Sequence, residues 1–581
     1  MAKRHIDSAW RLPGRLRPAG VARAPSATSR SPTLIGSKRQ LRDTRHFDSP
    51  VHLVGVAQPE VTRPEPAAGP DAVSQGPRSK LADSGGAGRP SARHLAAARW
   101  PLLTVLAVQF VLSLRLIWSN TAFQDEALYL RAGHLEWARW LHHTPIPNFP
   151  AYFSGAPVLY PPLGAVADSV GGLAAARSLS LCLMLGVTSL LWATTVRLYG
   201  QRAALLAAAL FGTLAGTQFL GALATFDTSA LFLLSAATWL AVRSASCQAR
   251  TRVALLLTAA ATLGAADAVK YATVLFTPAV LAVAAFAAWR QRGGRAGLMA
   301  LLAVLCPWLV LISAAMVAGG RNYWLGITAS TLSRPAAHVP VTTVLRSAYI
   351  WTSLILVLAI LGAILASRSK ERGRFLPAIL AAAALLAPAG QAGLGTTVSL
   401  QKHVVFGAWF AAIAAGYAMA RLSRVDPGHG WAAVMALPIA AATLFGSMGQ
   451  ATALHNAWPN ADAVINVLRT TIRAHPGHYL AEDYDVEAYY LRDLRAEAPW
   501  PRWSSTYSFS YGQALPGAPS YLAAIDKHYF SLVILDFGDT AATDNQIVAD
   551  MRQAGGYYVL ARAGWFTVWA TQASARPAGG T

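Results

Sequence analysis

The chain has 581 residues, of which 54% are hydrophobic and only 13% are charged, and its mean hydropathy is +0.37. An ordinary soluble domain carries roughly 25% charged residues, so this composition predicts many apolar segments rather than one soluble core. The net charge of +22 would suggest a nucleic-acid partner, but the basic residues gather in the N-terminal part and between apolar runs. That placement is typical of membrane topology and argues against nucleic acid. Cys182, Cys247 and Cys306 are too few and too scattered for a disulfide framework or a zinc site.

Residues 1–98 are rich in Arg, Pro, Ser, Gly and Ala and have no helical or strand period. Such a composition is typical of disorder. The segment begins without the apolar run and cleavage site of a signal peptide. We therefore expect a disordered basic tail on the cytoplasmic side, with weak affinity for anionic lipids at most.

Apolar runs long enough to cross a bilayer begin at residue 100 and continue to residue 447. They cover 100–118, 173–196, 203–220, 225–242, 253–269, 271–289, 297–317, 346–367, 375–391, 404–420 and 431–447. These runs predict about eleven membrane-spanning helices in a domain of residues 99–447. Arginines and lysines fall in alternate connections, which places the N-terminus in the cytoplasm and the C-terminal segment outside the plasma membrane.

The expected outer segments are of three kinds. The first loop, 119–172, holds many aromatic residues and a helical pattern over Ala127–Leu141 that is typical of a helix in the membrane interface. A second long loop is predicted at 318–345. The last segment, 448–581, is predicted to be a small extracytoplasmic α/β domain, because strand-like and helix-like runs alternate in it. The strand-like runs are 478–482, 531–535, 557–561 and 566–570, and the helix-like runs are 461–474, 485–494, 519–529 and 543–554.

Asp125 and Glu126 follow the first apolar run directly. Adjacent carboxylates at a membrane interface are costly unless they are exposed, paired or functional. One of them can remove a proton from an acceptor hydroxyl. The alternative is an exposed helix start, where acidic residues interact favourably with the helix dipole.

Asp227 lies in a very short turn between two apolar runs, and again both function and helix capping explain it. Asp267 and Lys270 lie one helical turn apart, and the simplest expectation is that they neutralise each other. Several cations stand on the predicted outer side, against the usual distribution. Together they suggest an anionic ligand such as a phosphate, although each one alone could extend toward the interface. They are Arg177, Lys270, Arg321, Arg334, Lys402 and His403.

Acidic residues also gather in the C-terminal segment where a predicted strand passes into a helix: Glu482, Asp483, Asp485 and Glu487. That location is common for binding residues, and a solvated helix start explains it nearly as well. The triplet Asp536-Phe537-Gly538 matches one kinase motif, but nothing else of a kinase is present, so we attach no function to it. The sequence has no Walker loop, dinucleotide fingerprint, HExxH pair or nucleophile elbow.

The order of these short motifs resembles the membrane glycosyltransferases of the GT-C fold. The resemblance covers about residues 100–420 and is greatest to bacterial relatives of protein O-mannosyltransferases and aminoarabinose lipid A transferases. It is carried by the Asp125-Glu126 pair and by the segments Tyr160–Gly164, Ala175–Leu179, Ala224–Asp227 and Ala268–Tyr271. The loop at 318–345 matches the family only loosely, which weakens the case for Arg321 and Arg334.

The resemblance implies an enzyme that transfers a hexosyl or pentosyl group from a polyprenyl-phosphate donor to an envelope acceptor at the outer face. It implies that Asp125 is the general base, that Glu126 positions Asp125 or the acceptor, and that the cations above hold the donor phosphate. Asp227 would assist the acceptor or bind a divalent cation, and no other cofactor is implied. The prenyl tail would lie among the membrane lipids.

Two other classes of function stay open on the sequence alone. A transporter or lipid flippase would show charges near the middle of its spans and paired repeat halves. A non-catalytic envelope scaffold would use its outer domain to bind a partner and would not need Asp125.

Overall fold

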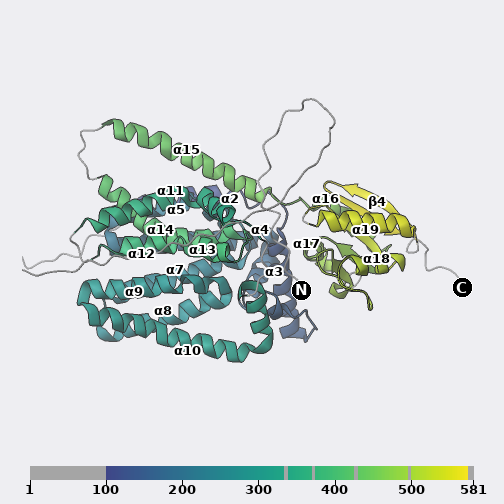
Figure 1. Cartoon of the computed structure of the whole chain (residues 1–581), viewed down its shortest axis with the longest axis horizontal. Coiled ribbons are helices and arrows are strands. Elements are labelled where there is room, and N and C mark those ends of the chain that lie inside the picture. Colours follow the sequence, from purple (N-terminus) through teal and green to yellow (C-terminus); the bar gives the residue numbers. More distant parts are fainter. Residues whose placement is uncertain are drawn as a thin grey trace, which may run out of the picture. The chain divides into compact units, whose positions relative to one another are not determined.

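A computed structural model of the chain describes residues 100–332, 338–369, 373–423, 430–494, 499–538 and 540–572. Two predictions fall outside the described residues: the tail at 1–98 and Arg334. The described chain is a helical body followed by a small domain that contains a sheet (Figure 1).

Helices occupy every apolar run that the sequence predicts, either singly or as a bent pair. The long helices are α2 (Trp100–Leu114), α3 (Gln124–His142), α4 (Tyr160–Tyr199), α5 (Gln201–Thr213), α6 (Ala215–Gly221), α7 (Phe226–Ser244), α8 (Ala249–Val269), α9 (Thr277–Arg292), α10 (Gly294–Ile327), α11 (Val341–Ser367), α12 (Leu376–Ala383), α13 (Leu386–Gly393), α14 (Leu400–Leu422) and α15 (Gly430–His455). Short turns of helix lie between them: η1 (Phe149–Ala151), η2 (Tyr271–Phe276) and η3 (Thr328–Leu332).

Among the described residues, six helices are long and apolar enough to cross a membrane. The number rises to eight if the bent pairs α5–α6 and α12–α13 each form one span. The chain is therefore a multi-pass membrane protein, and the larger count of about eleven spans stays a prediction.

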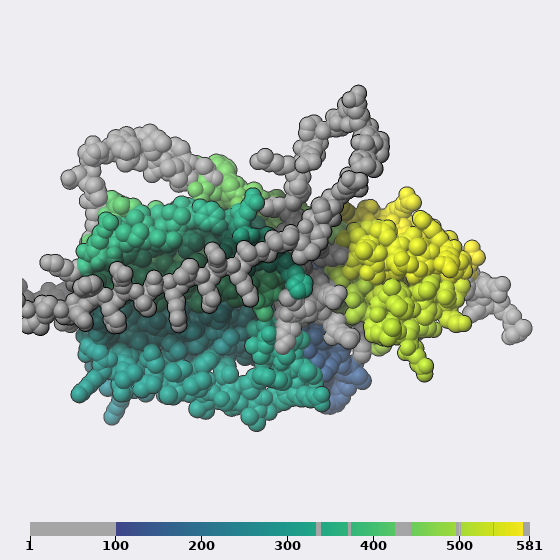
Figure 2. All heavy atoms as spheres, viewed as in Figure 1, coloured from purple at the N-terminus to yellow at the C-terminus, as the bar shows by residue number. Residues whose placement is uncertain are grey.

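The helices of the body differ sharply in how much of their surface neighbouring helices cover. In the most apolar 18-residue window of α14, 89% of the residues are buried, whereas in α10 the share is 11%. Helix α14 packs against α5, α11 and α12 and is the central element of the body. Helix α10 packs beside α8 and α9 (Figure 1) and lies at the surface of the body (Figure 2). The apolar side chains of Val310 and Val317 on this helix are exposed. Because those side chains are apolar, we interpret this surface as lipid-facing.

Helix, rather than irregular loop, occupies much of the predicted outer segment 318–345. Helix α10 breaks at Gly320, where φ is +63°, and then continues to Ile327. The π-helix η3 follows, and α11 begins at Val341. The end of α10 packs against η1, where an added Cβ on Gly326 would lie 2.1 Å from the Pro150 carbonyl oxygen. Only glycine permits that approach.

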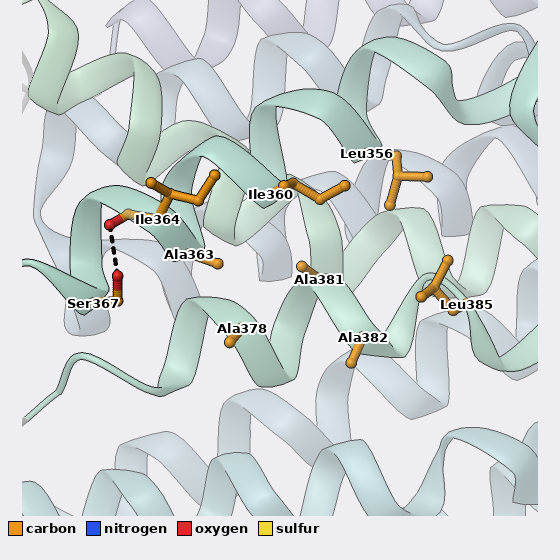
Figure 3. Close-up of a pocket in the computed structure, with 9 residues that line it drawn as sticks. All are labelled: Leu356, Ile360, Ala363, Ile364, Ser367, Ala378, Ala381, Ala382 and Leu385. Atoms are coloured by element: carbon orange, nitrogen blue, oxygen red, sulfur yellow. Dashed lines mark hydrogen bonds between the residues drawn. The ribbon is translucent and has the colours of Figure 1, made fainter.

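A groove of about 410 Å³ runs between α11 and α12 on the body (Figure 3). It is lined by Leu356, Ile360, Ala363, Ile364, Ser367, Ala378, Ala381, Ala382 and Leu385. The Ser367 hydroxyl donates to the Ile364 carbonyl oxygen and is therefore occupied. The groove can accommodate an apolar chain but offers no group for chemistry.

The C-terminal domain is the small α/β domain that the sequence predicts. Its helices are α16 (Asp462–Thr471), α17 (Tyr484–Tyr490), α18 (Ala518–Asp526) and α19 (Ala541–Ala554), with short turns η4 (Arg492–Leu494) and η5 (Trp500–Arg502). Its strands are β1 (His478–Ala481), β2 (Trp503–Ser505), β3 (Phe530–Leu535), β4 (Tyr557–Ala563) and β5 (Phe566–Thr571). The four predicted strands are confirmed. Strand β2 was not predicted, since three residues give no measurable alternation.

The sheet has the order β2-β1-β3-β5-β4. Strand β1 pairs in parallel with β2 and β3, whereas β5 pairs antiparallel with β3 and β4. All six residues of β3 are buried, because one face packs on the core that contains α16 and the other on the core that contains α18 and α19. The carboxyl ends of β1 and β3 therefore open at the same edge of the sheet.

Candidate active site

Helix α3 directs the adjacent carboxylates of Asp125 and Glu126 into two different surroundings. Successive side chains on a helix point about 100° apart, so neighbours in sequence meet different partners. Both residues lie in the first turn of α3, with exposed fractions of 8% for Asp125 and 0% for Glu126. The alternative of an exposed helix start is therefore wrong for both.

Glu126 forms a fully buried ion pair with Arg177 of α4. The Arg177 Nε atom donates to Oε1 at 2.8 Å, and Nη2 donates to Oε2 at 2.7 Å. The same carboxylate accepts the backbone N–H groups of Ala224 at 2.7 Å and of Phe123 at 2.9 Å. Burial alone would raise the pKa of Glu126, but the charge and hydrogen bonds of Arg177 and these amides hold it below its usual value.

The Arg177 guanidinium uses all of its donors in this structure. Besides the two bonds to Glu126, it donates to the carbonyl oxygens of Ile117 at 2.7 Å, Asn120 at 2.9 Å and Thr121 at 3.0 Å. A guanidinium has five N–H groups, so none is left for a donor phosphate. Arg177 therefore ties the connection between α2 and α3 to α4 and holds Glu126 in place.

Asp125 pairs with Lys402 from the first turn of α14. The Lys402 Nζ atom lies 2.6 Å from Asp125 Oδ2, and Lys402 is only 1% exposed. The same ammonium lies 4.9 Å from the centre of the Phe123 ring. Asp125 also forms a hydrogen bond with Tyr129, one turn farther along α3. Burial, followed by the charges of Asp125 and Asp227, raises the pKa of the Tyr129 phenol well above its usual value.

Asp227 pairs with Lys270, and this pair replaces the Asp267–Lys270 pair that the sequence predicts. The Lys270 Nζ atom lies 2.6 Å from Asp227 Oδ1, and Thr225 Oγ1 donates to Oδ2 at 3.0 Å. Asp267 instead accepts from Trp308 Nε1 at 2.8 Å and from Thr277 Oγ1 at 3.3 Å. The prediction failed because α8 ends at Val269, so Lys270 takes an extended conformation that directs its side chain away from the helix.

The backbone on both sides of Lys270 pairs with the segment that follows η1. Ala156 N–H donates to the Ala268 carbonyl oxygen at 2.8 Å, and Tyr271 N–H donates to the Ser154 carbonyl oxygen at 2.9 Å. An added Cβ on Gly155 would lie 1.9 Å from the Val269 carbonyl oxygen, so only glycine allows this approach. The first loop therefore fixes the position of Lys270.

The two ion pairs form one buried cluster, at the start of α3, α7 and α14 and the end of α8. Lys402 interacts electrostatically with Asp227 as well as Asp125, and the Asp227 carboxylate also interacts with His403. Two carboxylates and two ammonium groups thus neutralise each other in a poorly solvated place. We call Asp125, Asp227, Lys270 and Lys402 the charge cluster.

The remaining predicted cations lie apart from the charge cluster or at its border. His403 forms a hydrogen bond through Nδ1 with Gln391 Nε2 of α13 at 2.8 Å. Arg321 is exposed on the part of α10 beyond Gly320. Among the described residues, no hydrogen bond or ion pair joins Arg321 to the cluster.

Helix α3 also carries the contact with the C-terminal domain. On its N-terminal side, Gln124 donates to Asp483, and the N–H of Ala122 donates to the Tyr490 hydroxyl at 2.8 Å. Seven residues farther along α3, Arg131 pairs with Asp485 at 3.1 Å, and Asp485 interacts electrostatically with Asp125. Helix α17 therefore covers the same turns of α3 that hold the charge cluster.

Asp168 of α4 joins the same interface at its far end. Its carboxylate accepts from His134 Nε2 at 2.6 Å, from the Tyr489 hydroxyl at 2.5 Å and from Arg492 Nη2 at 3.0 Å. Three elements, α3, α17 and η4, therefore meet at one buried carboxylate. Sequence reasoning assigned no role to Asp168, which lies in a mainly apolar stretch without a motif, or to Tyr129, which lies four residues beyond Asp125 on α3.

Comparison with solved structures shows likeness along most of the chain. ArnT from Cupriavidus metallidurans in the apo state is 17% identical, with 83% of this chain and 100% of that chain covered and a TM-score of 0.53. ArnT bound to undecaprenyl phosphate is 15% identical, with 82% and 99% covered and a TM-score of 0.54. The archaeal oligosaccharyltransferase AglB from Archaeoglobus fulgidus, in complex with an inhibitory peptide and a dolichol-phosphate, is 14% identical, with 82% and 75% covered and a TM-score of 0.50.

The chain has the GT-C fold. No protein-family model and no curated protein matches the sequence, so the likeness is one of structure. At this level of identity it shows the fold alone.

We predict that Arg177→Lys destabilises the GT-C body strongly. Lysine keeps the charge but cannot supply five donors in a planar fork, so Glu126 and three carbonyl groups lose partners. Disruption of a buried ion pair costs about 3–5 kcal/mol. Thermal unfolding in nanodiscs measures the loss. The matched control is Arg197→Lys at the other end of α4, where the side chain is exposed and donates to Ser246 Oγ at 3.3 Å. Equal stability of the two variants would contradict this role.

We predict that Glu487 affects the stability of the C-terminal domain in a pH-dependent way. Burial, together with the Asp485 and Glu482 carboxylates, raises the pKa of Glu487 to about 8. The folded protein thus holds a proton that the unfolded chain releases near the usual glutamate pKa of 4.5. The wild type therefore loses stability relative to Glu487→Gln as pH rises between these two values.

The measurement for Glu487 is the difference in melting temperature between Glu487→Gln and the wild type at a series of pH values. The expected difference grows from pH 5 to pH 8. Asp462→Asn, at an exposed helix start, is the control and should give a difference that does not change with pH. A constant difference for Glu487→Gln would contradict the prediction.

Proposed function

We propose that the chain is a membrane glycosyltransferase that moves a sugar from a polyprenyl-phosphate donor to an envelope acceptor at the outer face of the plasma membrane. The observation that carries this proposal is the charge cluster, two buried carboxylate–lysine pairs at the ends of apolar helices. The GT-C fold supports it, since ArnT has been solved with undecaprenyl phosphate and AglB with a dolichol-phosphate. The predicted topology, with the N-terminus in the cytoplasm, places the cluster on the outer side.

The lysines of the cluster are well suited to a lipid-linked phosphate. In the structure Lys402 and Lys270 each have a carboxylate partner at 2.6 Å. A donor phosphate carries negative charge and would compete for these ammonium groups. As Lys402 turns toward the phosphate, Asp125 would lose its counter-ion and become a stronger base. Donor binding and activation of the base would then be one event.

The reaction is a single displacement at the anomeric carbon. The acceptor hydroxyl oxygen attacks that carbon, its proton passes to Asp125, and the bond between the anomeric carbon and the phosphate oxygen breaks. The phosphate then gains negative charge, which Lys270 and Lys402 neutralise in a poorly solvated site. Asp227 holds Lys270 in position for that role. His403 borders the same site, whereas Arg321 is our weakest assignment and Arg177 acts only through Glu126.

The surroundings of Asp227 favour lysine over a metal ion as its counter-charge. The Lys270 ammonium lies against Oδ1, and Thr225 donates to Oδ2. A divalent cation would have to displace that ammonium and would meet a second one on Lys402. We therefore assign the charge compensation to the lysines.

We predict that Asp125→Asn lowers transfer by about 10²–10⁴-fold, the range for loss of a general base. The measurement follows radiolabelled polyprenyl-phosphate sugars in nanodiscs, with envelope extract as the acceptor. Glu136→Gln is the control, since Glu136 lies on the same helix and pairs with Arg139 rather than with the charge cluster. Equal turnover by Asp125→Asn and the wild type would exclude Asp125 as the base. Donor that crosses the bilayer without transfer would identify a flippase instead.

We predict opposite effects of the two partners on donor binding. Lys402→Gln should weaken binding of polyprenyl phosphate at least tenfold, because a phosphate ligand is lost. Asp125→Asn should bind it as tightly as the wild type or more tightly, because Lys402 loses its internal partner. Equilibrium binding of polyprenyl phosphate in detergent measures both. Equal weakening in both variants would point to structural damage and contradict the exchange of partners.

A further inference from the structure

Three carboxylates of the C-terminal domain meet at the carboxyl ends of β1 and β3. Glu482 follows β1, Asp536 follows β3, and Asp544 lies in the first turn of α19. One oxygen from each lies within 4.8 Å of the others. Parallel neighbouring strands bring their carboxyl ends to one edge, which is where open α/β sheets bind ligands. Neither the proposed transfer reaction nor the sequence analysis uses Asp536 or Asp544.

Two backbone amides that follow β3, those of Gly538 and Thr540, donate hydrogen bonds to the Glu482 carboxylate. Thr540 N–H donates to Oε1 at 2.6 Å, and Gly538 N–H donates to Oε2 at 3.1 Å. An added Cβ on Gly538 would lie 3.4 Å from oxygens of both Glu482 and Asp536. The Thr540 hydroxyl donates to Asp544 Oδ1 at 2.9 Å. Backbone amides thus hold Glu482, and the Thr540 hydroxyl holds Asp544 beside it.

The second carboxylate oxygen of Asp544, Oδ2, lacks a hydrogen-bond partner among the described residues. Asp544 itself is 0% exposed. Its carboxyl lies in contact with that of Glu482, which also contacts Asp536. Carboxylate oxygens accept hydrogen bonds and do not donate them, so such contacts are favourable only with a shared proton or a cation between them. In the part of the chain that the structure describes, no lysine or arginine pairs with any of the three.

We infer that Glu482, Asp536 and Asp544 form a binding site for one hard divalent cation, of the class of Ca²⁺, Mg²⁺ and Mn²⁺. The ligand atoms are carboxylate oxygens, which these ions prefer over nitrogen or sulfur. A cation would also compensate the charge of three carboxylates that share one partly buried space.

The place of the site gives the cation a structural consequence. Asp483 is the next residue after Glu482, and it accepts a hydrogen bond from Gln124, the neighbour of Asp125 on α3. It also interacts electrostatically with Asp536 and Glu482. A bound cation would therefore order the turn between β1 and α17 that contacts α3. The inference goes beyond glycosyl transfer and does not depend on it.

The test uses the full chain in nanodiscs after removal of metal with EDTA. Mn²⁺ is added and its binding is followed by electron paramagnetic resonance, while thermal unfolding is compared in Ca²⁺ and in EDTA. The expected result is one saturable Mn²⁺ per chain and a higher melting temperature in Ca²⁺. Asp544→Asn and Glu482→Gln should each weaken Mn²⁺ binding at least tenfold and abolish the effect of Ca²⁺. Asp550→Asn should retain both, since Asp550 is equally buried on α19 but lies outside the three carboxylates.

A further comparison separates a cation site from a structural role of these side chains. In EDTA, Asp544→Asn and the less buried Asp536→Asn should unfold at the wild-type temperature or above it, because each removes a repelling charge. Absence of saturable Mn²⁺ binding to the wild type would overturn the inference in favour of shared protons. Unchanged Mn²⁺ affinity in all three variants would place the ion elsewhere and overturn it equally. None of these readouts requires transferase activity, so failure here leaves the proposed function untouched.

Discussion

The buried contact between Glu126 and Arg177 is the interaction on which the arrangement of the site depends. Arg177 joins α4 to the connection between α2 and α3 through three carbonyl oxygens. Glu126 joins α3 to the turn before α7 through the Ala224 amide. A buried carboxylate or guanidinium is costly to desolvate unless its hydrogen bonds are complete. Here the hydrogen bonds of both groups are complete, so the pair holds the start of α3 in a fixed position.

The Glu126–Arg177 pair explains why the adjacent Asp125 and Glu126 have different partners. Glu126 uses all of its hydrogen-bonding capacity to hold the helix, and Asp125 is then carried to a fixed place beside Lys402. The lysines of the charge cluster are matched one to one with carboxylates in the absence of a ligand, which makes the cluster tolerable in apolar surroundings. Because each lysine already has a carboxylate partner, an anion that binds a lysine must displace that carboxylate. The four side chains are thus neutral as a group without a ligand, and the proposed reaction uses the same four.

The C-terminal domain contacts the same part of the helical body. Its helix α17 contacts α3 through Gln124 and Arg131 and meets α4 at Asp168, so the turn that carries Asp125 lies between the body and the domain. The acidic residues at the start of α17, which a solvated helix start would explain by sequence, are instead partly or fully buried. A cation at the neighbouring carboxylates would link the sheet edge to the same turn. The domain and the candidate active site therefore share α3 through a few contacts.

The sequence by itself determined the elements and the region of interest. Apolar runs indicated the positions of the helices, strand-like runs located four of the five strands, and the order of short motifs led to the GT-C fold. Asp125, Asp227, Lys270 and Lys402, which the motifs or the charge distribution singled out, do lie together. These signals are local, because periodicity and hydrophobicity act over the length of one element.

Only the tertiary structure decided which charges are partners. Asp125 and Lys402 are 277 residues apart, and no local pattern predicts that they meet. The expected Asp267–Lys270 pair failed for the same reason: helical spacing made it plausible, but the end of α8 turned Lys270 toward Asp227. Likewise, the triplet that contains Asp536 indicated no function in the sequence. The parallel pairing of β1 and β3 places Asp536 beside Glu482. Ion pairs and ligand sites depend on distance in space and on burial, and both arise only when the helices and strands have packed.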